Sequence, residues 1–137
     1  MADTGYRSDA ARFPALDPPR PAPLSIGDGG MWSTAADLLR WCDGLNLDRF
    51  GITDLLQTPG RLDDGTEIDY AWGMGVRDRH GIRVFRHGGS YANVRATLAR
   101  VPDRGGDLLV LAPDDRTERR TALVDALLDR LIPLTGP

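Results

Sequence analysis

Apolar residues recur at helical spacing in two segments of the chain, one over residues 34–46 and one over residues 117–132. Ala35, Leu38, Leu39, Cys42 and Leu45 follow this spacing and predict a helix over 34–46. Thr34, with Asp37 three residues later, forms an acidic variant of a capping box at its start. A second amphipathic helix is predicted over 117–132, from the cap Thr117 to Pro133, and its apolar stripe holds Leu123, Val124, Leu127, Leu128 and Leu131.

Between these helices the pattern is that of strands, over about 70–112. Tyr70–Arg77 and Ile82–His87 flank a polar tetrad ending in Gly81, which predicts a hairpin. In 94–101, Val94, Ala96 and Leu98 alternate onto one face. Leu108–Ala112 is a continuous apolar run, typical of a strand covered on both faces. A short helix over 53–57 precedes the strands, and the whole predicts an α+β fold, an antiparallel sheet with packed helices.

Proline separates the first residues from this pattern. Five of the ten prolines fall within residues 1–24, which predicts an extended arm ahead of a domain spanning 25–137. With 137 residues and 41% apolar side chains, the chain holds one domain or less.

Composition excludes several function classes. The 17 basic residues are all arginine and are interleaved with 20 acidic ones, so no one-signed face for nucleic acid is expected. Two histidines and the single Cys42 predict no metal site, and no cofactor is expected. No apolar run is long enough to span a membrane, and no signal peptide is recognisable, so the expected location of the chain as written is the cytoplasm.

The segment His87-Gly88-Gly89-Ser90 is the candidate for chemistry. One interpretation is a glycine turn beside an exposed histidine. The other is a strand edge where the missing side chains let a substrate lie against the backbone. The Ser90 N–H would then polarise a carbonyl oxygen, and His87 would assist proton movement.

Other reactive or aromatic residues have structural explanations. Ser33 and Thr34 are interpreted as helix caps, and Cys42 as a buried, inert thiol on the apolar face of its helix. His80 is expected in a solvated turn. The tryptophans are expected in the core: Trp32, Trp41 and Trp72.

Several segments, in order, resemble the C-terminal part of the serine β-lactamase and D-alanyl-D-alanine carboxypeptidase superfamily, in its class C and esterase-like branch. Met1–Tyr6 resembles the end of the family's "LGM-x-x-T" segment, and Gly29–Leu38 its "GG-(L/M)-x-ST-A-x-DL" helix start. Tyr70–Gly75 is similar to its "Y-G-x-G" strand. His87–Ser90 falls at the family's third motif, Lys-Thr-Gly or His-x-Gly, and Val101–Asp103 closes the next strand.

The resemblance implies a serine hydrolase acting on an amide, ester or β-lactam carbonyl of a small-molecule or peptide-like substrate. It implies catalytic roles for His87 and for the Ser90 backbone donor. It also implies substrate contacts by Gly88, Gly89, Tyr91 and Asn93. Tyr91-Ala92-Asn93 has the spacing of the family's Tyr-x-Asn motif but follows the third motif, so we interpret this match as coincidental.

The family's other catalytic groups are absent from these 137 residues. Ser-x-x-Lys cannot occur because the chain contains no lysine. The chain is therefore expected to be a C-terminal portion of such a domain, inactive alone, whose partner is the missing N-terminal half or a second copy. A gene fragment, a misplaced start codon and a split protein are all compatible with it. The alternatives are a non-catalytic binding remnant of the fold and an unrelated α+β domain.

Overall fold

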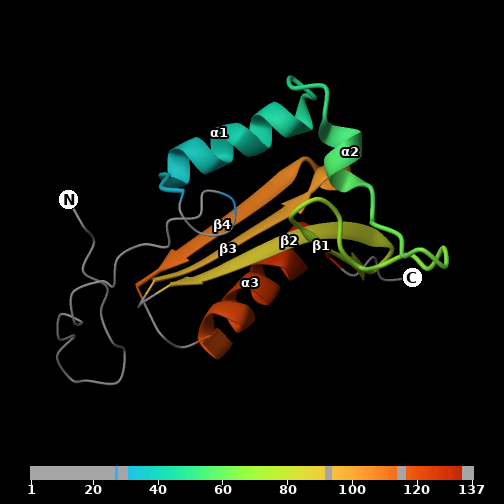
Figure 1. Ribbon diagram of the computed structural model, residues 1–137. Helices are drawn as coiled ribbons and strands as arrows, with labels where there is room; N and C mark the ends of the chain where they lie inside the picture. The colour runs from blue at the N-terminus through green and yellow to red at the C-terminus, as the bar shows by residue number, and fades with distance from the viewer. Residues whose placement is uncertain (1–26, 28–30, 92–93, 114–116, 134–137) are drawn as a thin grey trace, which may run out of the picture.

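The computed structural model describes residues 27, 31–91, 94–113 and 117–133. Four antiparallel strands form one sheet in the order β1-β2-β3-β4. Their bounds are Gly75–Arg79, Ile82–Tyr91, Val94–Val101 and Gly106–Ala112. Helix α1 (Ala35–Asn46) lies over one face and α3 (Thr117–Leu131) over the other (Figure 1). A short α2 (Thr53–Gln57) and a 3-10 helix, η1 (Pro102–Arg104), complete the elements. The α+β prediction is confirmed.

Helix α1 begins where its cap predicts. The Thr34 side chain accepts a hydrogen bond from the Asp37 N–H at 3.1 Å, and its hydroxyl donates to the Asp37 carboxylate at 2.9 Å. These reciprocal bonds satisfy an N–H that the helix itself leaves without a partner. The proline-rich arm over 1–24 lies outside the described residues.

The sheet has an apolar cluster on each face, because side chains alternate along each strand. On the α3 face, six buried residues pack together: Val84, Ala99, Val101, Val124, Leu128 and Ile132. On the α1 face, the buried set comes from β1, β2 and the turn before β1: Ala71, Met74, Val76 and Phe85, with Leu98 packed against them. Both clusters adjoin β2, which fixes that strand from both sides.

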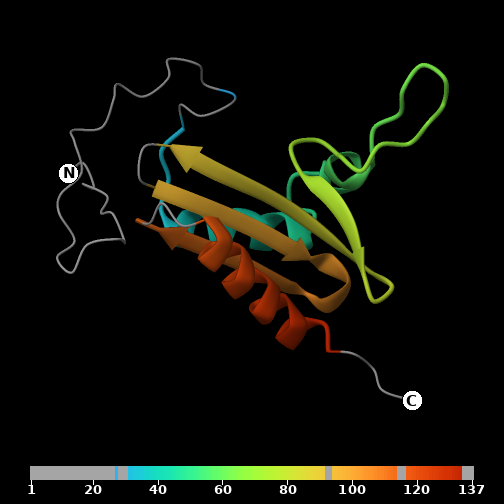
Figure 2. The same ribbon diagram turned by 90° about the horizontal axis from the view of Figure 1, so that it is seen from below.

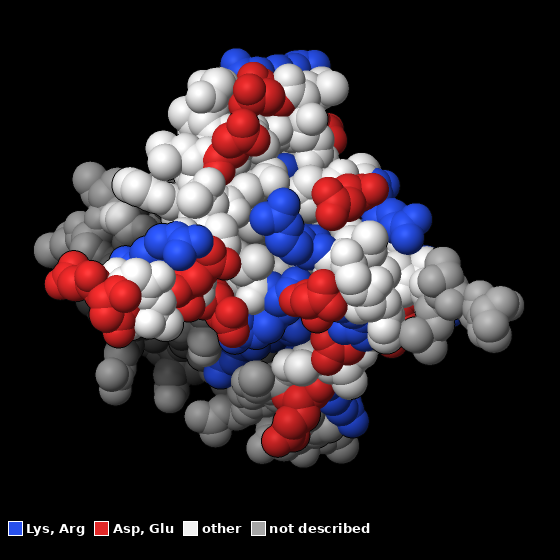
Figure 3. All heavy atoms as spheres, turned by 90° about the vertical axis from the view of Figure 1, so that its right-hand side faces the viewer, with Lys and Arg blue, Asp and Glu red and all other residues white. Residues whose placement is uncertain are grey.

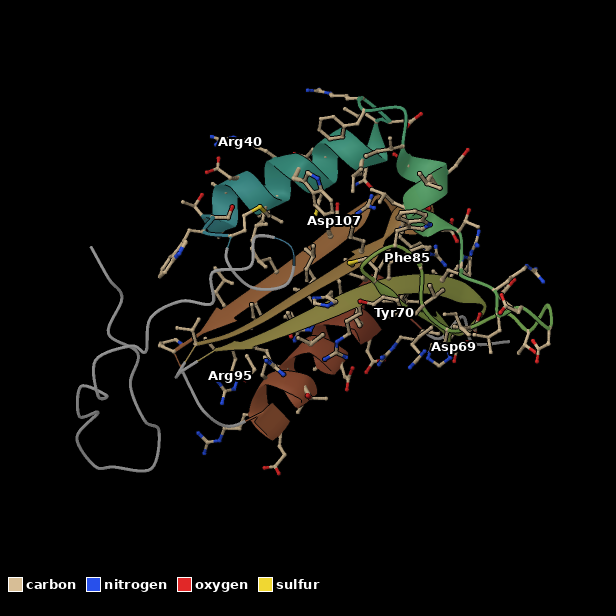
Figure 4. All side chains as sticks on the ribbon, in the orientation of Figure 1. Arg40, Asp69, Tyr70, Phe85, Arg95 and Asp107 are labelled. Carbon is tan, nitrogen blue, oxygen red and sulfur yellow. The ribbon has the colours of Figure 1, made fainter. Side chains whose placement is uncertain are left out.

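Ion pairs supplement this packing. Under α1, the buried ion pair of Arg100 and Asp107 is hydrogen-bonded to the exposed Asn46, and Figure 4 shows Asp107 on the side of the sheet facing α1. On the opposite face, Arg79 and Arg86 contact Asp125 of α3. Helix α3 is thus tied to the sheet by ion pairs and apolar packing, and α1 by the hydrogen bonds of Asn46 to Arg100 and Asp107.

Two predicted strand boundaries are wrong. The strand predicted from Tyr70 begins only at Gly75, because Ala71–Met74 forms a tight turn closed by the Ala71 N–H on the Met74 carbonyl, with Gly73 at φ +82°. Conversely, the strand predicted to end at His87 continues to Tyr91. The hairpin between them is tighter than expected, since only His80 and Gly81 connect the strands, both at positive φ.

Three burial predictions are also wrong. Strand β4 is an edge strand, and its Leu111 is 46% exposed rather than covered on both faces. On α3 only Val124 and Leu128 of the predicted stripe are fully buried, whereas Leu123 and Leu131 are exposed. All three tryptophans are exposed, Trp32 to 77%, so they do not form the core.

Candidate functional site

The second half of β2 forms an open strand edge. Strand β1 pairs with β2 only from Ile82 to Arg86, where Gly75 is the last partner. Beyond that point β2 remains paired with β3, through to Tyr91 opposite Val94. Figure 2 shows β2 continuing past the start of β1. Residues 87–91 therefore have a paired side, toward β3, and a side that no strand of the described residues pairs with, which we call the open edge.

The register shows which backbone groups point toward the open edge. The Val76 N–H donates to the Asp69 carbonyl at 3.0 Å, away from β2, so Val76 and Phe85 form a pair without ladder hydrogen bonds. The neighbouring pair, Gly75 and Arg86, is then the bonded one. Since backbone direction alternates along a strand, Gly88 and Ser90 direct their N–H and C=O groups toward the open edge.

The two glycines are not required by the fold. Neither has a positive φ. A Cβ added at Gly88 would lie 3.7 Å from the Ala96 carbonyl oxygen, and one at Gly89 would lie 3.6 Å from the Ala96 Cβ. Both distances are ordinary van der Waals contacts, so larger residues fit within the chain itself. Glycine here leaves space on both faces beside the open edge.

The side chains next to these glycines project to opposite faces. His87 lies opposite Leu98 on the α1 face, and its imidazole is exposed. Ser90 lies opposite Arg95 on the α3 face, where Figure 4 also places Arg95. His87 and the Ser90 hydroxyl therefore do not meet. The Ser90 backbone N–H lies in the plane of the sheet, so its direction toward the open edge does not depend on which face carries the Ser90 hydroxyl.

Arg120, which no pattern in the sequence singles out, supports this segment. Arg120 of α3 donates from its guanidinium to the Gly89 carbonyl at 3.2 Å and to the Ala96 carbonyl at 3.4 Å. It thereby ties α3 to the paired side of β2, behind the open edge. The locally basic run Arg116–Arg120 was the available signal, but only tertiary packing shows which arginine reaches the strand.

The turn before β1 lies at the beginning of the open edge. Its residues Ala71 and Met74 are buried beneath it, while Trp72 is exposed. Gly75 directly follows this turn and lies opposite Arg86, one residue before His87. An aromatic side chain is thus exposed on the loop that adjoins the site.

Two predicted site positions fall where the structure does not describe the side chain. The side chain of Tyr91 and all of Asn93 lie outside the described residues, as do the resembling segment Met1–Tyr6 and the glycines of the other segment before Met31.

The remaining candidates have structural roles. Thr34 caps α1, and Ser33 is exposed beside it. Cys42 is fully buried, and burial, followed by the negative charge of Asp107, raises the pKa of its thiol to about 11. His80 is exposed in the hairpin turn. Within the described part of the chain, no group of three or more His, Cys, Asp or Glu residues is arranged to hold a metal ion.

Charges of both signs intermix on the surface. Figure 3, which views the end of the molecule carrying α2 and the turn before β1, shows arginines and acidic residues side by side. Ion pairs such as Arg61–Glu67 and Arg77–Asp69 account for this mixture. No helix among the described residues is long and apolar enough to cross a bilayer.

Comparison with known families identifies the class of protein. The family model described as Beta-lactamase matches residues 2–129, which is nearly the whole chain. The chain therefore belongs to the beta-lactamase family, and its α+β sheet with helices on both faces is part of a serine hydrolase-like fold. No curated protein matches the chain.

Proposed function

We propose that this chain supplies the substrate-binding strand of a β-lactamase-related serine hydrolase that acts on an amide, ester or β-lactam carbonyl. The observation that carries the proposal is the open edge, where Gly88 and Ser90 direct backbone groups outward and no Cβ blocks positions 88 and 89. An extended, peptide-like substrate can add to such an edge by main-chain hydrogen bonds. Within this class of hydrolase, the proposed activity is that of a D-alanyl-D-alanine carboxypeptidase or of an esterase.

The direction of the Ser90 N–H, toward the open edge, supports its proposed role as an oxyanion donor. During acyl transfer the carbonyl oxygen gains negative charge, and a fixed backbone donor stabilises that charge without reorganisation. Loss of one such donor lowers the rate by about 10²–10³ in a well-studied hydrolase. His87, on the α1 face, is proposed to assist proton transfer, a smaller effect because its imidazole is exposed to solvent.

The nucleophile and its activating lysine must come from outside these 137 residues, since they contain no lysine. We therefore expect the chain alone to form no acyl-enzyme. Incubation with a fluorescent penicillin or a fluorophosphonate, followed by intact mass measurement, tests this expectation. A stoichiometric serine adduct would contradict it.

Activity is tested by joining this chain to an upstream half that carries Ser-x-x-Lys and Tyr-x-Asn. With a chromogenic ester, Gly89→Val should lower kcat/KM by about 10²–10³, because a β-branched side chain beside the open edge obstructs the substrate and disturbs the Ser90 N–H. His87→Ala should have an intermediate effect. His80→Asn is the matched control, because asparagine tolerates the positive φ at that exposed turn, and its effect should be below about 0.5 kcal/mol.

The outcome separates the proposal from its alternative, a non-catalytic module that binds ligands at the same edge. The absence of lysine favours that alternative for the chain by itself. Turnover by the joined protein that depends on Gly89 supports the hydrolase. A folded joined protein that binds substrate analogues without turnover would favour the binding module.

A further inference from the structure

The peptide group between Gly89 and Ser90 connects the interior of the sheet to the open edge. Its C=O and N–H point in opposite directions, because the peptide is trans. The Ser90 N–H is directed toward the open edge. The Gly89 carbonyl is directed toward β3, where Gly89 and Ala96 lie opposite each other, and the alternation along β2 makes them a hydrogen-bonded pair. A group that contacts the Gly89 carbonyl therefore acts on the same peptide group as the proposed oxyanion donor.

Arg120 contacts this carbonyl from the α3 face of the sheet. Its Nη1 donates to the Gly89 carbonyl oxygen at 3.2 Å and to the Ala96 carbonyl oxygen at 3.4 Å. A carbonyl oxygen has two lone pairs, so the Gly89 carbonyl can accept from Arg120 and from the Ala96 N–H together. One cationic group thus holds both members of a bonded pair, on the side of β2 away from the open edge.

The charge of Arg120 has no carboxylate partner among the described residues. Two other arginines on this face do have such partners. Arg79 pairs with Asp125 and Asp129, and Arg86 pairs with Asp125. The Nε of Arg120 is also buried without a hydrogen-bond partner, which costs free energy. The contacts with the two carbonyls, rather than an ion pair, therefore explain the position of Arg120.

A cation that donates to a carbonyl also changes the N–H of the same peptide group. It draws electron density toward the carbonyl oxygen and makes the N–H a stronger donor, and charge-assisted hydrogen bonds are about twice as strong as neutral ones. We propose that Arg120 is a positioning residue that fixes the Gly89–Ser90 peptide group and polarises the Ser90 N–H toward the open edge. The inference rests on the proposed function, because the polarised N–H is assigned to the carbonyl oxygen of the substrate.

Polarisation and a merely structural role predict opposite changes in hydrogen exchange at the Ser90 amide. Exchange of an amide that faces the open edge is catalysed by base, and a more polarised N–H loses its proton more readily. Removal of Arg120 should therefore slow exchange at Ser90 if Arg120 polarises the peptide group. It should accelerate exchange if Arg120 only holds the strand, because a loosened strand opens more often.

NMR of the full chain measures these changes. In Arg120→Met, which keeps the apolar part of the side chain, the Gly89 carbonyl carbon and the Ser90 amide nitrogen should both shift upfield, and Ser90 should exchange more slowly. Arg120→Lys, which keeps the charge, should restore part of each change. Arg119→Met is the matched control, since it removes the same charge from an exposed position on α3, and it should leave both signals unchanged. Circular dichroism checks folding, and if Arg120→Met does not fold, Arg120→Gln removes the charge with the same expected directions.

Kinetics of the joined protein test the consequence for catalysis. Arg120→Met should lower kcat about two- to tenfold with KM unchanged, because one hydrogen bond strengthens its neighbour by about 10–30% and loss of a whole oxyanion donor costs about 10²–10³. Unchanged shifts, faster exchange at Ser90, equal shifts in Arg119→Met or an unchanged kcat would each overturn the proposal. A folded joined protein without turnover would contradict the proposed function instead, and the shifts and exchange rates would still decide whether Arg120 polarises the peptide group.

Discussion

Replacing Asp107 with alanine removes the carboxylate that neutralises an arginine in the interior of the protein. Arg100 is 2% exposed, and its Nε donates to Asp107 at 3.2 Å. Asn46 of α1 completes the network, donating to Asp107 at 2.6 Å and accepting from Arg100 at 2.6 Å. The network therefore links α1, β3 and β4 through a charge that water does not reach.

The expected cost follows from this burial. Removing one partner of a buried ion pair leaves the other charge uncompensated, which costs about 3–5 kcal/mol. Small domains have total stabilities of about 5–15 kcal/mol, so Asp107→Ala should remove a large fraction of the free energy of unfolding. By contrast, Arg100→Met combined with Asp107→Leu removes both charges and should come within about 1 kcal/mol of the original protein or exceed it.

Urea unfolding at one fixed protein concentration measures these differences. Glu67→Ala is the matched control, because Glu67 pairs with Arg61 at 2.8 Å on the surface, where such a pair contributes about 0–1 kcal/mol. If Asp107→Ala and Glu67→Ala cost the same, the buried network does not hold α1 to the sheet. A double variant less stable than Asp107→Ala alone would also refute the reasoning.

Four further predictions concern α1 and its cap. Thr34→Ala should destabilise the protein by about 1 kcal/mol in urea unfolding, through loss of the helix cap, while Ser33→Ala has no measurable effect. The Thr34 side chain, followed by Arg40, holds the pKa of Asp37 below its usual value. This carboxylate therefore contributes stability above its unfolded-state pKa, and that stability is lost as pH falls through its folded-state pKa. NMR titration of Thr34→Ala should show the Asp37 pKa rising. Burial raises the pKa of Cys42 from 9.0 to about 11, because it disfavours the thiolate. The free energy of unfolding is therefore unaffected by this group below pH 9 and falls by roughly 2–3 kcal/mol as pH rises to 11. Thermal melts along that pH range measure this loss. In the folded protein Cys42 should resist thiol reagents at neutral pH, and rapid labelling there would contradict its burial.

Local chemistry made some elements predictable from the sequence. The cap at Thr34 and the apolar spacing behind it fix α1, since both signals are short-range. Gly81 after a polar run identifies the hairpin, although the exact two-residue turn depends on His80 adopting a positive φ. The family resemblance was carried by such local segments in order, and the family match confirms it.

Features that depend on neighbouring elements were not predictable in the same way. Leu108–Ala112 has the composition of a covered strand, yet its place at the edge of the sheet leaves Leu111 exposed. The residue type of the tryptophans predicts burial in the core, whereas Trp32 ahead of α1, Trp41 on α1 and Trp72 in the turn before β1 are all exposed. Gly88 and Gly89 gave an ambiguous signal between turn and strand, and only the register with β3 shows that the strand continues through them.

NMR titration of the chain with a peptide ending in two D-alanines tests whether the open edge of β2 receives an extended substrate. Weak binding is expected, with a dissociation constant of about 1 mM or above, because the proposed nucleophile and its lysine lie outside these 137 residues. The largest amide shifts should be at Gly88 and Ser90, should disappear in Gly89→Val, and should persist in His80→Asn. Shifts that are absent from these two amides, or that survive unchanged in folded Gly89→Val, would contradict substrate binding at the open edge.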